Sequence, residues 1–249
     1  MHSDSAATTA ELQDPPHRAL AAEPKLRPPH EAAELLAGHP ANLVAAALME
    51  LNPGFTQNIL ESLAPETVAA LETWVPPELA RQWRCNRAYP QDSIGRLMEP
   101  AYAVFRPKMT VGETIERLRA AAKLALVTYG YVVDEDGILR GLVTTRDLLF
   151  AEHGVRLESL MLRNVFTLAP ETTLGDAMNK VLDRHYPVYP VCDAAGKLLG
   201  LVRGQAMFEE QAIKITAQVG TTFGVEKEER LTTPIGQSFK YRHPWLQLN

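Results

Sequence analysis

The amino-acid sequence predicts an α+β protein with an all-α N-terminal domain, a duplicated α+β module and a C-terminal connecting helix. Short apolar runs separated by prolines fill residues 39–88. Matched apolar runs and turns then recur at an offset of about 60 residues, which indicates an internal repeat. The chain has 249 residues, of which 46% are hydrophobic and 22% charged, so it is long enough for one or two packed domains.

Residues 1–38 are rich in alanine, proline and glutamate. The prolines are Pro15-Pro16, Pro24 and Pro28-Pro29. Proline lacks a backbone N–H and disfavours helix in the residue before it. We therefore expect a flexible N-terminal tail over residues 1–38, with a helix beginning only within residues 31–37.

Residues 39–88 predict a series of short helices. Their apolar runs are followed by Pro53, Pro65 and Pro77, at intervals of about 12 residues. Proline is tolerated in the first turn of a helix, so each of these prolines marks the start of the next helix. Short helices cannot bury their apolar faces alone and must stack, as solenoid repeats do. We expect a small superhelical domain, with a plain helical bundle as the alternative.

The internal repeat predicts a helix–strand–strand–helix module in two copies. Leu97-Met98 matches Leu160-Met161, and Gly141-Leu142-Val143 matches Gly200-Leu201-Val202. In the first copy, Thr110 caps a helix over residues 111–122, which is followed by strands at 129–133 and 139–143 and a helix at 144–151. In the second copy, Thr173 caps a helix over residues 174–184, which is followed by strands at 188–192 and 198–202 and a helix at 204–218.

The segment Asp134-Glu135-Asp136-Gly137 has two interpretations. As a calcium loop, it lacks the spaced acids and the final glutamate of a twelve-residue EF-hand. As a turn between two apolar strands, it has the acidic residue and the glycine that a hairpin needs. We therefore predict a hairpin turn.

Composition excludes several function classes. The net charge of −5 argues against a nucleic-acid binder, which needs a basic face. Two cysteines, Cys85 and Cys192, rule out a disulfide scaffold and a cysteine-rich zinc module. No apolar run reaches the ~20 residues that span a bilayer, and no signal-peptide pattern begins the chain. No Walker loop, Rossmann glycine motif or nucleophile–histidine pair is visible, so we expect a binding protein and not an enzyme.

The repeat resembles the CBS domain (the cystathionine-β-synthase type), of which two copies form a pair. The segment 141–147 fits that family's pattern of glycine, two apolar residues, a hydroxyl residue and an aspartate. The resemblance implies an adenosine-nucleotide site, for ATP or a related nucleotide. Hydroxyl and carboxylate groups suit a ribose, a guanidinium suits a phosphate, and aromatic rings suit an adenine. The candidate residues are Thr144, Asp147, Arg146, Tyr129 and Tyr186.

A simple helix cap is the alternative role for Thr144 and Asp147, because both residue types are common at that position. In the second copy, Arg203 replaces the hydroxyl residue and Ala206 replaces the aspartate. We therefore expect at most one nucleotide site in each chain.

The order of the domains resembles the cytosolic region of MgtE-type magnesium transporters. The segment 89–98, Tyr-Pro-Gln-Asp-Ser-Ile-Gly-Arg-Leu-Met, is similar to the linker of that family, and residues 231–249 are similar to the segment that leads into its first membrane helix. The resemblance divides the chain into a helical domain (39–88), a first CBS domain with its linker (89–157), a second CBS domain (158–220) and a connecting helix (221–249). It implies a cytoplasmic position at the inner face of the membrane, with a transmembrane domain downstream of Asn249.

The same resemblance implies a magnesium sensor. In that family, Mg²⁺ between the helical domain and the CBS pairs holds a homodimer compact, and loss of the ion lets acidic surfaces repel each other. Mg²⁺ prefers carboxylates and retained waters. The acidic run of the last CBS helix is reduced here to Glu209 and Glu210, and with Asp92 these are the candidate metal ligands; ordinary solvated carboxylates are the alternative. A free-standing adenosine-nucleotide sensor, with the helical domain as an adaptor, is the second hypothesis.

Overall fold

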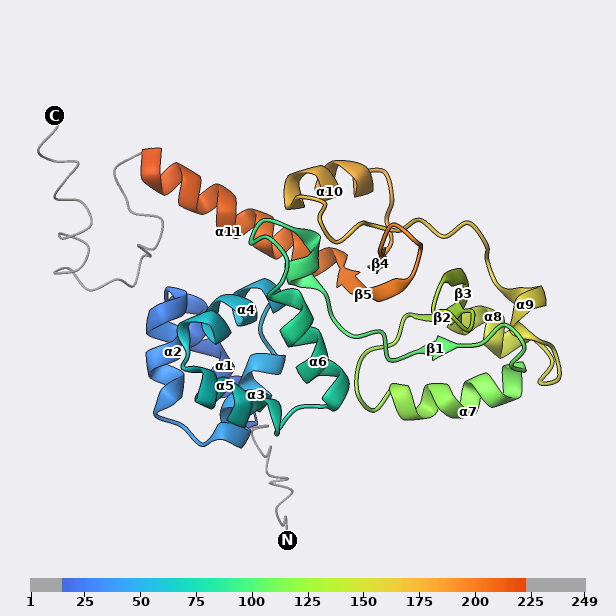
Figure 1. Ribbon diagram of the computed structural model, residues 1–249, viewed down its shortest axis with the longest axis horizontal. Coiled ribbons are helices and arrows are strands. Elements are labelled where there is room, and N and C mark those ends of the chain that lie inside the picture. Colours follow the sequence, from blue (N-terminus) through green and yellow to red (C-terminus); the bar gives the residue numbers. More distant parts are fainter. Residues whose placement is uncertain (1–14, 223–249) are drawn as a thin grey trace, which may run out of the picture.

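The computed structural model describes residues 15–222, and it confirms the predicted fold class (Figure 1). The helical domain consists of α1 (Pro16–Ala22), η1 (Pro24–Leu26), α2 (Pro29–Ala37), α3 (Ala41–Met49), α4 (Pro53–Ser62), α5 (Pro65–Glu72) and α6 (Pro77–Asn86). The predicted proline starts of α4, α5 and α6 are confirmed.

The prediction of a flexible tail is wrong for residues 15–30, whereas the helix predicted within residues 31–37 is confirmed by α2. Residues 15–38 form α1, η1 and α2, and Leu20, Ala32 and Leu36 are buried in the core of the helical domain. Proline occupies the first turn of α1, η1 and α2, as it does in α4. Its missing N–H costs nothing there, because the first N–H groups of a helix have no partner within the helix.

Each copy of the repeat folds as predicted into a helix, a hairpin and a second helix. The first module comprises β1 (Val104–Phe105), α7 (Val111–Ala121), β2 (Tyr129–Val133), β3 (Leu139–Thr144) and α8 (Thr145–Phe150). The second comprises α10 (Leu174–Val181), β4 (Val188–Cys192), β5 (Leu198–Arg203) and α11 (Gly204–Thr222). In the first sheet, β1 pairs parallel with β2 and β2 pairs antiparallel with β3, while β4 and β5 form an antiparallel hairpin.

The segment that precedes each module packs into the other module. The short helix η2 (Ile94–Leu97) contributes Ile94 and Leu97 to the core of the second module, whereas α9 (Leu157–Leu160) contributes Leu157 to the core of the first. Two glycines permit this exchange. A Cβ on Gly141 would lie 2.7 Å from the carbonyl oxygen of Leu162, and a Cβ on Gly200 would lie 3.0 Å from that of Glu99.

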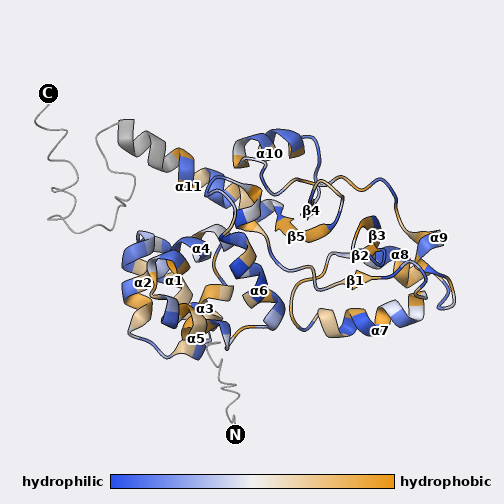
Figure 2. Cartoon of the chain, in the orientation of Figure 1, coloured by the Kyte–Doolittle hydropathy of each residue, from blue (hydrophilic) through white to orange (hydrophobic). Residues whose placement is uncertain are grey.

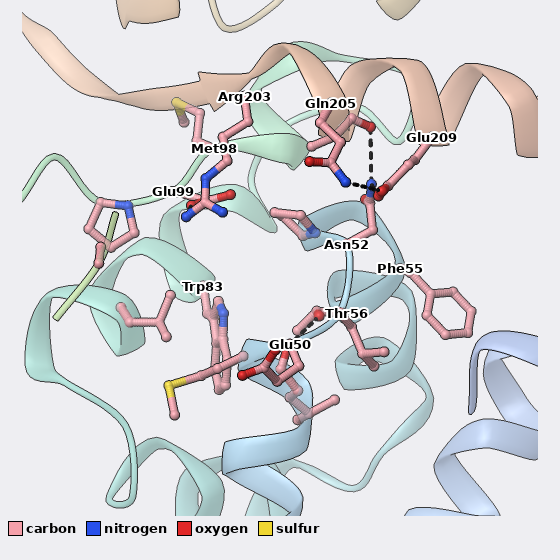
Figure 3. Close-up of a pocket in the computed structure, with 18 of the residues that line it drawn as sticks. Glu50, Asn52, Phe55, Thr56, Trp83, Met98, Glu99, Arg203, Gln205 and Glu209 are labelled. Carbon is pink, nitrogen blue, oxygen red and sulfur yellow. Dashed lines mark hydrogen bonds and ion pairs between the residues drawn. The ribbon is translucent and has the colours of Figure 1, made fainter. Parts of the chain in front are cut away.

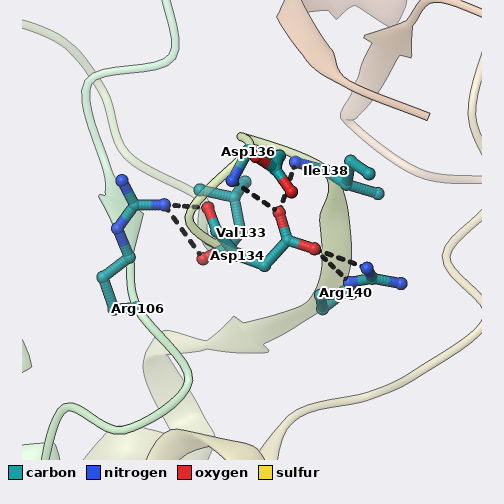
Figure 4. A network of polar contacts seen from close by, with 6 residues as sticks. All are labelled: Arg106, Val133, Asp134, Asp136, Ile138 and Arg140. Carbon is teal, nitrogen blue, oxygen red and sulfur yellow. Dashed lines mark hydrogen bonds and ion pairs between the residues drawn. The ribbon is translucent and has the colours of Figure 1, made fainter. Parts of the chain in front are cut away.

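The hairpin turns are closed by backbone and aspartate contacts. Gly137 and Gly196 take φ values of +83° and +82°, which a residue with a side chain rarely adopts. In the first turn, the Asp134 carboxylate accepts the N–H groups of Asp136 (3.1 Å) and Ile138 (3.0 Å) and the guanidinium of Arg140 (2.6 Å; Figure 4). The hairpin interpretation is therefore confirmed.

The last described helix, α11, leads away from the second module and over the helical domain (Figure 1). Hydrophobic and hydrophilic residues alternate along the surface helix α7 (Figure 2). Between residues 15 and 222, none of the helices has the length and apolar character needed to cross a bilayer. Most of the predicted connecting helix, from residue 223 onward, lies outside the described residues.

Candidate functional site

The helical domain docks on the second module through the N-terminus of α4. Asn52 caps this helix by accepting a hydrogen bond from the N–H of Gly54 (2.9 Å). Its Nδ2 donates to the carbonyl of Ala206 (3.0 Å) and to the carboxylate of Glu209 (3.2 Å), both on α11. Gln205 donates to the other carboxylate oxygen of Glu209 (2.9 Å). Since a helix N-terminus carries partial positive charge, an acidic partner on α11 is favourable there.

The linker between the helical domain and the first module, residues 89–98, is bound by side chains of α4 and α6. Arg96 is 3% exposed, and its Nη1 donates to Glu61 on α4 (2.5 Å). The hydrogen bond from Arg96 holds the pKa of Glu61 below its ordinary value. On α6, the fully buried Asn86 donates to the carbonyl of Met98 (2.8 Å). The docked arrangement thus contains a buried cation and a buried amide, each with a partner.

The three residues expected to bind magnesium all lie at this junction. Asp92 and Glu210 line one small cavity of about 10 Å³, together with Gly54 of α4. Lys214 lines the same cavity, and its ammonium group contacts the Asp92 carboxylate. Glu209 does not line this cavity, because its carboxylate is turned towards Asn52 and Gln205.

Two carboxylates and two cationic side chains, those of Arg96 and Lys214, line the small cavity at this junction. In the described part of the chain, no three His, Cys, Asp or Glu side chains gather as a metal-binding group. Mg²⁺ commonly takes one or two carboxylates and keeps several waters, so Asp92 and Glu210 are the residues of this cavity that would serve as its protein ligands.

A larger cavity of about 620 Å³ separates the helical domain from the second module (Figure 3). Trp83 and Glu50 line it on the side of the helical domain, and Glu99 and Arg203 lie opposite. Glu99 and Arg203 form an ion pair of 2.7 Å. Burial raises the pKa of Glu99, and the nearby guanidinium opposes that rise. Next to the contacts of Asn52, the helical domain and the second module are therefore separated by this cavity and do not pack together in a continuous core.

Thr144 and Asp147 form a capping box at the start of α8. The Thr144 hydroxyl donates to Oδ2 of Asp147 (2.7 Å) and accepts the Asp147 N–H (3.1 Å), while Oδ2 also accepts the Thr144 N–H (2.9 Å). The cap interpretation is thus confirmed as a structural role. Within residues 15–222, Oδ1 of Asp147 accepts no hydrogen bond, so the cap leaves one carboxylate oxygen for a ligand.

The other predicted nucleotide residues lie around this cap. Tyr129 stands opposite Thr144 in the β2–β3 ladder. Burial raises the pKa of Tyr129, and the nearby Tyr186 of the second module raises it further. Arg146 is exposed on α8. The structure therefore brings Tyr129, Thr144 and Asp147 to one end of a hairpin.

The second module uses the corresponding motif positions for contacts between domains. Arg203, which stands where the first module has Thr144, pairs with Glu99, and the carbonyl of Ala206 accepts Asn52. Sequence reasoning noticed both departures from the motif but missed their partners. It also missed Arg96 and Lys214, since their partners lie 35 and 122 residues away along the chain.

Comparison with known proteins agrees with this geometry. The family model for the CBS domain matches residues 94–154 and 157–209. The magnesium transporter MgtE of Thermus thermophilus is 34% identical over 157 residues, which cover 63% of this chain and 32% of that protein. The chain spans 26% to 35% of the length of its first three curated relatives, all of them MgtE transporters.

Two solved structures share the fold of most of this chain. The soluble part of a magnesium transporter superposes with a TM-score of 0.66 at 20% identity, covering 80% of this chain and 78% of that one. The cytosolic domain of the Mg²⁺ channel MgtE, crystallised in complex with ATP, superposes with a TM-score of 0.53 at 28% identity, covering 78% and 90%. The chain is therefore homologous to the cytosolic domain of MgtE magnesium transporters and contains a tandem pair of CBS domains.

Proposed function

We propose that this chain is the cytosolic regulatory region of a magnesium transporter, which gates transport by ion-dependent association of its domains in a homodimer. It acts at the inner face of the membrane, attached to a transmembrane domain that follows Asn249. The proposed role is regulatory and not catalytic. The junction of α4, the linker and α11 carries the proposal, because Asp92 and Glu210 share one small cavity beside the helical domain.

In this mechanism, Asp92 and Glu210 would hold a partly hydrated magnesium ion, which would add positive charge beside the two carboxylates. Their shared cavity borders Gly54, so neutralising them keeps α11 and the linker next to α4. Asn52 and Arg96 then make the contacts that fix the docked position. Without the ion, repulsion between the carboxylates favours separation of the helical domain.

Exposed apolar residues on two helices support a homodimer. On α8, Leu149 and Phe150 are 74% and 78% exposed, and on α11 Phe208 is 59% exposed. Exposed patches of large apolar side chains commonly mark an interface with another chain. In a homodimer with a two-fold axis, each chain uses the same surface to cover that surface of its partner. These apolar residues would then be buried in both chains.

Thermal unfolding tests the ion dependence. A ligand that binds the folded state at ten times its dissociation constant stabilises it by about 1.4 kcal/mol, so Mg²⁺ should raise the unfolding temperature by a few degrees. We expect the double variant Asp92→Asn, Glu210→Gln to lose this rise. Asp183→Asn, a carboxylate exposed beyond α10, should keep it. An equal rise in all three proteins would overturn the assignment of Asp92 and Glu210.

A second candidate function is binding of an adenosine nucleotide, either alongside ion sensing or as a free-standing sensor. The cluster of Tyr129, Thr144 and Asp147 supports this function, and Tyr186 lies near enough to Tyr129 to raise the pKa of its hydroxyl. The 28%-identical MgtE domain crystallised with ATP supports it further. At this cluster, Oδ1 of Asp147 is suited to accept a ribose hydroxyl and Arg146 is suited to pair with phosphate.

Calorimetric titration with AMP, ADP and ATP tests this candidate. Asp147→Ala should cost about 1 kcal/mol of stability through loss of the cap and should also abolish nucleotide binding. Asp176→Ala removes a carboxylate that accepts the Thr173 hydroxyl at the start of α10 and is the matched control. It should leave nucleotide binding unchanged. Binding that survives Asp147→Ala, or no binding by the unmodified chain, would contradict the proposal.

A further inference from the structure

We infer that the large cavity between the helical domain and the second module binds an uncharged, planar heteroaromatic molecule that accepts hydrogen bonds. Its volume of about 620 Å³ lies within the range of ~300–1,000 Å³ that is typical of sites for small organic ligands. Trp83 on α6 and Arg203 on β5 line it from opposite sides, so the ligand would bridge the two domains (Figure 3). The inference uses the docked arrangement itself and requires no metal ion, so it goes beyond the proposed function.

Three hydrogen-bond donors line this cavity with N–H or O–H groups that have no partner within residues 15–222. Trp83 is only 4% exposed, and its indole N–H makes no hydrogen bond in that part of the chain. Arg203 is paired with Glu99 through Nη2 (2.7 Å), and its other N–H groups are free of protein partners there. The hydroxyl of Tyr102 likewise has none. A ligand that accepts hydrogen bonds would satisfy these groups.

Two tyrosine hydroxyls strengthen the donor character of this site. Burial, together with the charges of Glu78 and Glu99, raises the pKa of Tyr102 to about 12, so its hydroxyl stays protonated at neutral pH. A recess of about 30 Å³ shares Glu99, Tyr102 and Arg203 with the large cavity, and Tyr131 lines it. Tyr131 is 1% exposed, and its hydroxyl is buried without a partner among the described residues. A buried hydroxyl that lacks a hydrogen bond is costly, which favours an acceptor in this recess.

The charges around the cavity indicate an uncharged ligand. Each charged side chain that lines it already has an interaction partner: Lys25, Glu50, Glu99, Arg203 and Glu209. A charged ligand would have to compete with one of these contacts, and removing the partner of a partly buried charge costs free energy. An uncharged ligand leaves all of them intact.

The rest of the wall favours a flat ring. Met49, Leu79 and Leu124 make it largely apolar, and the rings of Trp83 and Tyr102 provide aromatic surface against which a planar molecule can pack. Apolar walls with a few placed polar groups are typical of cavities that bind small molecules. A heteroaromatic ring with carbonyl or ring-nitrogen acceptors matches both the walls and the free donors.

Ligand-observed NMR titration with caffeine, with and without millimolar Mg²⁺, tests this inference. Caffeine is uncharged and planar, and it accepts hydrogen bonds but donates none. Trp83→Phe keeps an aromatic ring and removes the N–H, whereas Tyr102→Phe removes only the O–H. Each should weaken caffeine binding about fivefold, which corresponds to the loss of one hydrogen bond. Trp74→Phe, at a tryptophan that is 59% exposed after α5, is the matched control and should bind like the unmodified chain.

Indole is the matched probe, because it is planar and uncharged but donates a hydrogen bond and does not accept one. It should bind the unmodified chain at least about fivefold more weakly than caffeine does. Equal binding of the two probes would show that the assigned ligand chemistry is wrong.

Caffeine binding that is the same in Trp83→Phe, Tyr102→Phe and Trp74→Phe would place the probe elsewhere and overturn the inference. So would the absence of caffeine binding to the unmodified chain in both conditions. Tyr102→Phe is the smaller change and keeps the test decisive if Trp83→Phe does not fold. Because caffeine binding and the magnesium-dependent rise in unfolding temperature are measured separately, failure of this inference leaves the proposed function standing.

Discussion

Arg96 connects the linker to the helical domain through a single charged contact. Only 3% of the residue is exposed, and its Nη1 donates to Glu61 at 2.5 Å. Its Nη2 is buried without a partner among the described residues. A buried guanidinium depends strongly on the partner that it has, because removing that partner leaves an uncompensated charge. Glu61 is therefore a docking residue of the helical domain.

Replacing Glu61 with glutamine should cost about 2 kcal/mol of unfolding free energy at pH 7, less than for a fully buried pair because Glu61 is 34% exposed. The Arg96 hydrogen bond lowers the pKa of Glu61 below 4.5, so its contribution is complete above that pH and is lost as the pH falls through the lower, folded-state value. Denaturant unfolding at several pH values should show the two proteins converge in acid.

Glu116→Gln is the control for that experiment. Glu116 pairs with Arg119 one turn along α7, and both side chains are more than two-thirds exposed. Its loss should change stability by less than about 0.5 kcal/mol. A cost at Glu61 no larger than at Glu116 would show that the Arg96 contact does not hold the linker.

Local sequence rules predicted single residues well wherever the partner is close in the chain. The Thr110–Glu113 capping box and the positive φ of Gly137 follow from motifs of four residues. Asn52, which bonds to Glu209 across 157 residues, carries no local signal that distinguishes it from an ordinary N-cap. The candidate site was therefore predicted in its residue types but not in its partners.

At the scale of elements, the exchange of η2 and α9 between the modules explains why a Leu-Met pair and a strand glycine both recur in the repeat. Leu97-Met98 and Gly200 lie against each other in the second module, and Leu160-Met161 and Gly141 do so in the first. A division at residue 157 follows the order of the chain, whereas each of these two segments packs in the core of the other module. The four hairpin strands were predicted to within one residue, but the short strand β1 was not predicted.

The close approach of α4 to α11 gives a prediction for two glycines at equivalent helix positions. Gly54 and Gly175 are both the second residue of their helices. A Cβ on Gly54 would lie 2.8 Å from Leu97 Cδ2 and 3.0 Å from Glu210 Oε2, whereas a Cβ on Gly175 meets nothing within 4 Å.

Gly54→Ala should therefore destabilise the chain by about 1–3 kcal/mol through overpacking at the docking interface. Gly175→Ala should stabilise it by about 0.5 kcal/mol through reduced entropy of the unfolded chain. Chemical unfolding of both variants measures the difference. Equal stabilisation by both substitutions would mean that α4 does not press on η2 and α11.

For the whole molecule, the linker is the segment that connects the helical domain to the second module. It joins the helical domain through Arg96 and Asn86, and it joins the second module through Ile94 and Leu97. Among the described residues, the buried side chains of these two parts form separate cores, and the large cavity lies between them. Such an interface is suited to a domain that docks and separates, since little apolar surface is exposed when it opens.

Small-angle X-ray scattering of this chain, with and without millimolar Mg²⁺ at matched ionic strength, tests the ion-dependent association most directly. The account predicts the mass of a homodimer in both conditions and a smaller radius of gyration with Mg²⁺. The Asp92→Asn, Glu210→Gln variant should keep the larger radius. A radius that is unchanged by Mg²⁺ in the unmodified chain, or a monomeric mass, would contradict the account.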